Sequence, residues 1–335
     1  MRISENRRRE RKSSIMAPKK QPESNLLLEE PLELSPALRP QPKSERNGAT
    51  RPTLQEGSPL TPSPKKDFSL LETQFQGMIG KMKSVREPCA SSISERHRAA
   101  ILDWIVEVMA VYKQSDLSLF RCARLIDAFY ASSSKERRIS EAVKEEEKSV
   151  VSSSDIHLTG SAAISLASKF DNARFIPLKT LQNQILQGRF SVEELVQREI
   201  ELVSKSNFDM AKPTPPELLI TSLSLLPLSE NATEFIKNAG LMMLRMWMFS
   251  GEIMRGFSDA EMTGLALVLG VKLMEQMRPE LKSGELMEAV VARFQLGGPL
   301  LFQKLQMLHQ FTLQFEEMVP NARNLIKYHT FAKTL

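Results

Sequence analysis

Residues 158–169 read LTGSAAISLASK, and no residue of this stretch before Lys169 carries a formal charge. A segment that is uncharged on every side and rich in Gly, Ala and Ser predicts a central helix surrounded by other helices, because small side chains let neighbouring helices approach. The lysine at its end has two explanations. Either the cation stabilises the negative end of the helix dipole, or it binds a partner.

The same pattern occurs a second time at residues 262–272, which read MTGLALVLGVK, so that Thr-Gly pairs stand at 159–160 and 263–264. Segments with the apolar periodicity of amphipathic helices flank both stretches. No segment alternates with period two for long enough to predict a strand. The sequence therefore predicts an all-α fold made of two copies of a five-helix unit, each of roughly 100 residues.

The remaining sequence divides around these two helices. Residues 1–66 form a basic Pro/Ser-rich tail that we expect to be disordered, and residues 67–93 contain an amphipathic helix and its connection. We assign residues 94–212 to the first helical unit and residues 213–335 to the second. Residues 135–154 balance basic against acidic side chains, which predicts a solvated loop or a short exposed helix.

The tail carries the basic charge of the chain. It holds 14 of the 45 Lys and Arg residues and 8 of the 40 Asp and Glu residues, so the remainder is close to neutral. The run NRRRERK at 6–12, followed by Lys19 and Lys20, is typical of a two-part nuclear import signal, and we expect the protein in both nucleus and cytoplasm. A plain solvated tail is the alternative. Thr61 and Ser63 precede prolines and are possible phosphorylation sites, unless the segment is only a proline-rich spacer.

Several classes of function have no support in the sequence. The two cysteines, Cys89 and Cys122, and the four scattered histidines do not form a metal-ligand pattern, and we expect no metal and no cofactor. No phosphate-binding Gly-rich loop and no nucleophile motif is present, so we expect no enzymatic activity. No uncharged apolar run approaches the ~18 residues of a membrane span, and we expect an intracellular protein without a membrane partner.

A second charge lies in an apolar position. The segment from Val192 begins with a capping box, Ser191 to Glu194, and continues as an amphipathic helix whose apolar stripe includes position 199. That position is Glu199, and a carboxylate there must be paired or lie where the stripe leaves the core. Either Lys169 and Glu199 form an intramolecular bridge at the edge of the core, or they form a rigid polar pair that binds a partner's backbone.

Longer motifs resemble a known family. The stretches RAAILDWIVEV, LIDAFYA, LTGSAAISLASKFD, VQREIELVSKSNFDMAKPTP and NARNLIKYH follow the order that they have in cyclins. The resemblance covers about residues 94–335 and is greatest to A/B-type, mitotic cyclins. It implies tandem five-helix cyclin folds with an N-terminal docking helix. It also implies a regulatory subunit that binds and activates a cyclin-dependent Ser/Thr protein kinase in cell-cycle control.

The resemblance implies three groups of residues. Those that would bind the kinase are Lys169, Glu199, Phe170, Leu166 and Val203, with Phe75 on the preceding helix. Those that would form a docking patch for substrates or inhibitors are His97, Ile101, Trp104, Glu107 and His157. Those with a structural role are Arg98, which would pair with Asp127, and Asp103. In the docking patch the two histidines replace residues that cyclins usually have, which makes the patch more polar.

An alternative from another class is a cyclin-fold adaptor or scaffold that activates no kinase, comparable to transcription factors that place tandem cyclin folds on DNA. Such an adaptor would need a basic face on the two units. The near-neutral charge of residues outside the tail speaks against this, and we expect no nucleic-acid partner.

Overall fold

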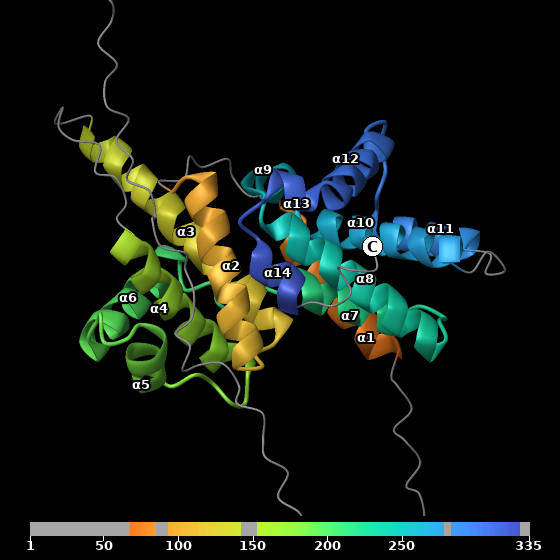
Figure 1. Ribbon diagram of the computed structural model, residues 1–335. Helices are drawn as coiled ribbons and strands as arrows, with labels where there is room; N and C mark the ends of the chain where they lie inside the picture. Colours follow the sequence, from red (N-terminus) through yellow and green to blue (C-terminus); the bar gives the residue numbers. More distant parts are fainter. Residues whose placement is uncertain (1–67, 85–92, 142–152, 278–282, 329–335) are drawn as a thin grey trace, which may run out of the picture. The chain divides into compact units, whose positions relative to one another are not determined.

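The computed structural model describes residues 68–84, 93–141, 153–277 and 283–328, of which residues 133–141 and 153 are described by their backbone alone. Every regular element in these ranges is a helix (Figure 1), which confirms the predicted all-α class. The predicted tail and the sites Thr61 and Ser63 lie outside the described residues. None of the described helices is long and apolar enough to cross a membrane.

The first unit is built around α4. It comprises α2 (Glu95–Val111), α3 (Asp116–Glu141), α4 (Ser153–Asp171), α5 (Leu178–Thr180) with the π-turn η2 (Leu181–Ile185), and α6 (Val192–Lys205). Helix α4 packs against α2, α3 and α6. Its side chains from Ala162 to Ile164 are fully buried, as the uncharged sequence predicts.

The second unit repeats this plan around α10. It comprises α7 (Pro215–Ser224), α8 (Glu230–Met248), a short α9 (Gly251–Gly256), α10 (Asp259–Met277), α11 (Gly284–Phe294) and α12 (Leu301–Leu313), followed by α13 (Phe315–Met318) and α14 (Arg323–Tyr328). Helix α10 packs against α7, α8 and α11. The last helix, α14, returns to the first unit and packs on α2 (Figure 1). The boundary at 212/213 stays a prediction, although it falls between α6 and α7.

The two central helices repeat each other in detail. The hydroxyl of Thr159 donates to the carbonyl of Asp155 at 2.7 Å, and that of Thr263 donates to the carbonyl of Asp259 at 2.7 Å. The glycine after each threonine stands at a close helix contact. A Cβ at Gly160 would lie 2.6 Å from the Ile101 side chain of α2, and one at Gly264 would lie 2.8 Å from the Phe294 ring of α11. The Thr-Gly pairs are therefore packing signals in both units.

Helix caps formed by residues close together in the sequence follow the sequence pattern. The Ser191 hydroxyl accepts from the Glu194 N–H, and the Glu194 carboxylate accepts from the Ser191 N–H, which confirms the predicted capping box. Helix α10 begins with a similar Ser-x-x-Glu sequence, Ser258 to Glu261, of which the structure describes one capping bond. Ser258 accepts from the Glu261 N–H, and the Glu261 carboxylate pairs with Lys304 of α12.

Two predictions about the surface need correction. Helix α3 continues to Glu141, so residues 135–141 are helical and only 142–152 lie outside the described residues. Helix α1 spans Phe68–Met82 as predicted, but it packs on α7 and α10 of the second unit and buries Phe75, Met78 and Met82 there.

Candidate functional site

The two charges that are unusual in the sequence meet at one edge of the first unit. The Lys169 ammonium at the end of α4 lies 2.7 and 2.9 Å from the two carboxylate oxygens of Glu199 on α6. Glu199 is only 9% exposed, whereas Lys169 reaches the surface. The predicted bridge is therefore present. An ammonium group has three N–H donors, and the two that bind Glu199 hold the third in a fixed direction.

Exposed apolar side chains occur on the two helices that carry this pair. Phe170 follows the lysine and is 50% exposed, and Val196 and Ile200 are exposed on α6, three residues before and one residue after Glu199. Leu166 on α4 and Val203 on α6 are half-buried. An apolar surface with a paired charge at its centre is typical of a protein interface, where apolar contacts supply area and a rigid polar pair fixes the orientation of the partner.

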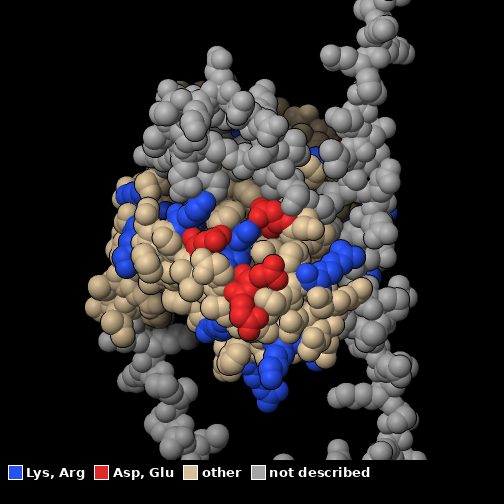
Figure 2. Space-filling model, turned by 90° about the vertical axis from the view of Figure 1, so that its left-hand side faces the viewer, with Lys and Arg blue, Asp and Glu red and all other residues tan. Residues whose placement is uncertain are grey.

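The face that carries α3, α5 and α6 in Figure 1 is turned towards the reader in Figure 2. Acidic side chains gather near its middle and basic ones lie around them, with uncharged surface between the groups. The described residues of this face thus offer charges of both signs.

Sequence reasoning missed three exposed apolar side chains, one on α6 and two in the segments that follow α4 and α6. Ile200 is exposed beside Glu199, Phe175 is exposed after α4, and Phe208 is 74% exposed after α6. Asn207 and Phe208 both have left-handed backbone conformations, with φ of 53° and 57°, which is uncommon for residues other than glycine. The signal for Ile200 was its place one residue after Glu199. Nothing local marks Phe208 as exposed.

The predicted contact through Phe75 is corrected by the structure. Its ring is fully buried and meets the Phe294 ring edge to face, with centroids 5.4 Å apart. The apolar side chains that α1 exposes are Phe68 and Leu70, in its first turn. If α1 provides a second contact for a partner, these side chains make it.

The predicted docking-patch residues lie together but are mostly covered. Ile101, Trp104 and Glu107 are buried on α2, and the ring of Trp104 meets that of His157 edge to face at 5.7 Å. The Glu107 carboxylate accepts from the Tyr328 hydroxyl at 3.4 Å and lies 3.8 Å from the Lys327 ammonium, both on α14. His97 and His157 are half-buried. These five residues therefore expose little surface, and α14 contacts the acidic one.

The structural residues are found where they were predicted. Arg98 on α2 donates to both carboxylate oxygens of Asp127 on α3, at 2.7 and 2.9 Å, and it also donates to the Met248 carbonyl of the second unit at 2.8 Å. Asp103 accepts from the backbone at the start of α14. Burial raises the pKa of this carboxyl to about 6, against the opposite effect of these hydrogen bonds.

The described residues contain no group of three His, Cys, Asp or Glu side chains that could hold a metal ion. Cys122 is fully buried, and this burial raises the pKa of its thiol well above the usual range, so the side chain is not an accessible nucleophile.

Comparisons with known proteins relate part of the chain to one family. A family model described as Cyclin, N-terminal domain, matches residues 72–211. The chain is 29% identical over 129 residues to G2/mitotic-specific cyclin-B3 of Gallus gallus, and 28% identical over 149 residues to Cyclin-A2 of the same organism. These matches cover 38% and 44% of this chain. They cover 28% and 32% of the two relatives, so the chain spans about a third of their length or less.

Among solved structures, a viral cyclin from herpesvirus saimiri is similar with a TM-score of 0.49 and 12% identity. That similarity covers 79% of this chain and 97% of the viral one.

Proposed function

The chain is a member of the cyclin family, and on this premise we propose that it is the non-catalytic regulatory subunit of a cyclin-dependent Ser/Thr protein kinase, acting in cell-cycle control. The observation that carries the proposal is the Lys169–Glu199 pair, with Phe170 and Ile200 exposed beside it. Of these, Lys169, Glu199 and Phe170 are positions at which the resemblance to cyclins implies contact with the kinase.

The proposed mechanism is positional. The apolar surface packs against the regulatory helix of the kinase, while the Lys169–Glu199 pair hydrogen-bonds nearby backbone groups. Binding holds this helix in the position in which its Glu reaches the Lys that orients the ATP phosphates, and it orders the activation loop. The cyclin supplies no catalytic group. It shifts the kinase towards the active state only as far as it binds that state more tightly than the inactive one.

Substrate docking through the α2 patch is a weaker part of the proposal. Trp104 is 3% exposed and Glu107 contacts α14, so a docking peptide would have to displace α14 to reach this carboxylate. We expect poor recognition of docking motifs of the Arg-x-Leu type, and substrate choice by the kinase alone.

The tail supports a proposal about location and regulation. The basic run at 6–12 with Lys19 and Lys20 would direct part of the protein to the nucleus, and phosphorylation of Thr61 or Ser63 would add negative charge beside Lys65 and Lys66. A fluorescent fusion of residues 1–66, compared with one in which the basic run is replaced by alanines, tests the import signal. Equal distribution of both fusions would leave the tail a plain solvated segment.

Co-purification with candidate catalytic subunits tests the main proposal. Wild type is compared with Lys169→Glu and Glu199→Ala, and with Lys237→Glu as a control, because Lys237 pairs with Glu234 on α8 of the other unit. We expect wild type and the control to bind and activate a kinase, and the other two to lose both while keeping the circular-dichroism spectrum of the fold.

Two other outcomes would contradict the proposal. Binding without activation would favour a scaffold. Tight, steeply salt-dependent binding of nucleic acid by residues 94–335, without a kinase, would favour the adaptor.

A further inference from the structure

We propose that Arg121 positions the exposed ring of Phe170 and is a specificity-determining residue of the kinase-binding surface, an inference that rests on the function proposed above. Arg121 lies on α3, beneath that surface, and its side chain is 5% exposed. Its guanidinium carbon lies 4.3 Å from the centroid of the Phe170 ring. The ring therefore has one face on a fixed cation and about half of its area open to a partner.

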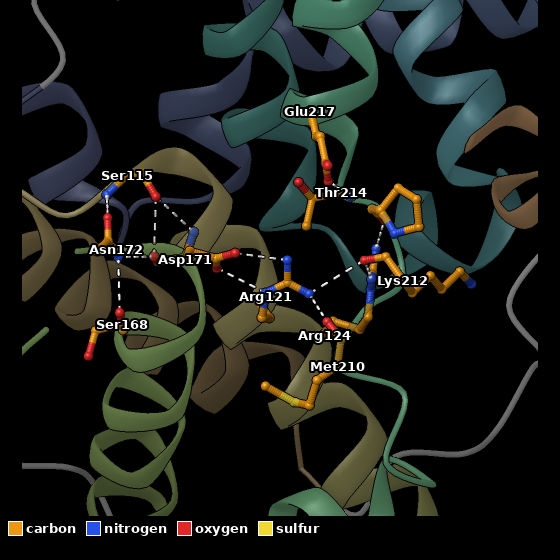
Figure 3. A network of polar contacts seen from close by, with 12 residues as sticks. Ser115, Arg121, Arg124, Ser168, Asp171, Asn172, Met210, Lys212, Thr214 and Glu217 are labelled. Carbon is orange, nitrogen blue, oxygen red and sulfur yellow. Dashed lines mark hydrogen bonds and ion pairs between the residues drawn. The ribbon is translucent and has the colours of Figure 1, made fainter. Parts of the chain in front are cut away.

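The guanidinium is held on several sides. Its Nε and Nη2 each donate to one carboxylate oxygen of Asp171, both at 2.9 Å, and the Asp171 side chain is only 4% exposed. Its Nη1 donates to the Met210 carbonyl and lies 3.4 Å from the Lys212 carbonyl. Figure 3 shows the guanidinium between Asp171 on one side and the 210–212 backbone on the other. A planar group bound along two edges cannot rotate, and so it provides a rigid support for an aromatic ring.

Arg121 joins the two segments that carry the surface. Phe170 and Asp171 end α4, directly after Lys169, and Met210 follows α6, which carries Glu199. One side chain therefore contacts both segments at their ends. The distance between these two segment ends decides whether the Lys169–Glu199 pair and the Phe170 ring can contact the same partner at the same time.

Stability alone does not explain this ion pair. Two charges lose their hydration when they are buried, and a pair of apolar side chains of similar volume is often as stable. An apolar residue at position 121 could not donate to two backbone carbonyls and to Asp171. It would also lack the flat guanidinium face that lies against the Phe170 ring. The arginine thus contributes direction and rigidity to the surface.

The neighbouring Arg124 provides a matched control. It lies one turn further along α3 and donates to the Lys212 carbonyl at 2.9 Å, to the Pro213 carbonyl at 2.7 Å and to Asp259 at 3.2 Å. It therefore binds the same junction as Arg121 (Figure 3), from a position one turn further from the end of α4 that carries Phe170. Substitution of Arg124 should therefore disturb the backbone at Lys212 and Pro213 without moving the Phe170 ring.

A double-mutant cycle on the full chain tests the inference. The Kd for the kinase that the wild type activates is measured for Arg121→Lys, Phe170→Ala, the double variant and Arg124→Lys, together with thermal unfolding. Lysine keeps the charge but loses the fork and the flat face. We expect Arg121→Lys to weaken binding about tenfold, Phe170→Ala to weaken it more, and the double variant to bind no worse than Phe170→Ala. Arg124→Lys should bind as the wild type does.

The other outcomes separate a failure of this inference from a failure of the proposed function. Wild-type affinity of Arg121→Lys, or independent effects of the two substitutions, would overturn the inference and leave the proposed function standing. If no kinase binds the wild type, the proposed function fails and this inference fails with it. If Arg121→Lys does not fold, Arg121→Met combined with Asp171→Leu replaces the ion pair by apolar groups. That variant should fold and show the same coupling to Phe170, and full kinase affinity in it would overturn the inference.

Discussion

The Asp103 carboxylate on α2 accepts hydrogen bonds from the backbone N–H groups of Asn324 and Leu325, at 2.8 and 3.3 Å, and so caps a helix 221 residues further along the chain. The Asn324 side-chain amide donates to the same carboxylate at 3.0 Å. The unpaired N–H groups at the start of α14 are satisfied by a residue of the other unit. This cap attaches the end of the described chain to α2.

Asp103→Asn should make the stability of the protein less dependent on pH. Burial raises the pKa of the folded carboxyl to about 6 from 3.8. The stabilisation that this group contributes is therefore complete below pH 4 and is lost as the pH rises towards 6. Relative to the asparagine variant, the wild type should lose up to roughly 3 kcal/mol between pH 4 and pH 7. Urea unfolding at several pH values measures the difference in the free energy of unfolding between the wild type and the variant. A difference that does not change with pH would contradict a raised pKa of Asp103.

Asp103→Ala removes the cap as well as the charge. It should destabilise the protein by about 1–2 kcal/mol at pH 4, where the wild-type carboxyl is neutral. Hydrogen exchange should then be faster at Asn324 and Leu325 than in the asparagine variant, since the asparagine oxygen still accepts from the backbone. Equal exchange in the two variants would show that α14 does not depend on this cap.

Exchanging the charges of Lys169 and Glu199 separates folding from binding. The double variant Lys169→Glu/Glu199→Lys keeps an intramolecular pair, so its free energy of unfolding should stay within about 1 kcal/mol of the wild type. The donor and acceptor that face the kinase are reversed, and we expect binding to stay as weak as in Lys169→Glu alone. Isothermal calorimetry measures this, and recovery of kinase binding by the double variant would make the pair merely structural.

Helix α1 offers a comparison between a buried and an exposed phenylalanine. Phe75→Ala should cost about 3–5 kcal/mol, because the ring fills a core site against Phe294. Phe68→Ser should change stability by less than about 0.5 kcal/mol, since Phe68 is exposed. If α1 contacts the kinase, Phe68→Ser weakens that binding in a pull-down assay. Unchanged binding would remove α1 from the interface.

Alanine scanning of glycines tests the packing of the central helix. In Gly160→Ala the new methyl group would overlap the Ile101 side chain, at 2.6 Å, and approach the Trp104 ring at 3.2 Å. We expect a loss of about 1–3 kcal/mol from overpacking. Gly80→Ala in α1 meets nothing within 4 Å and should be neutral or stabilising by up to about 1 kcal/mol. Thermal melts compare the two, and a harmless Gly160→Ala would mean that α2 moves freely against α4.

Arg98 should be among the most sensitive positions in the molecule. Arg98→Leu leaves the Asp127 carboxylate and the buried Met248 carbonyl without this donor, which should cost about 3–5 kcal/mol. Arg255→Leu removes an exposed partner of Glu95 and should cost less than about 1 kcal/mol. Denaturant titration measures the free energy of unfolding of both variants. Similar decreases would mean that the contact of Arg98 with the second unit contributes no more than the exposed pair.

The helices themselves were predictable from the sequence. The 3.6-residue period of apolar residues depends on the neighbours along the chain. Helix α1 therefore lies within the range predicted for it, and α6 begins at the predicted cap. The Thr-Gly repeat identified both central helices because small residues such as glycine allow one helix to approach another closely, as Gly160 and Gly264 do. The Lys169–Glu199 pair was foreseeable because two charges in apolar positions must be paired.

Only the tertiary structure decided which of these side chains a partner can reach. Phe75 and Trp104 have the residue type and the periodicity of contact residues, yet both are buried. Phe170 and Phe208 remain exposed. The sequence analysis did not single out Arg121, whose partners Asp171 and the Met210 carbonyl lie 50 and 89 residues further along the chain. Periodicity is a local property of the chain, whereas exposure and hydrogen-bond partners depend on segments that only folding brings together.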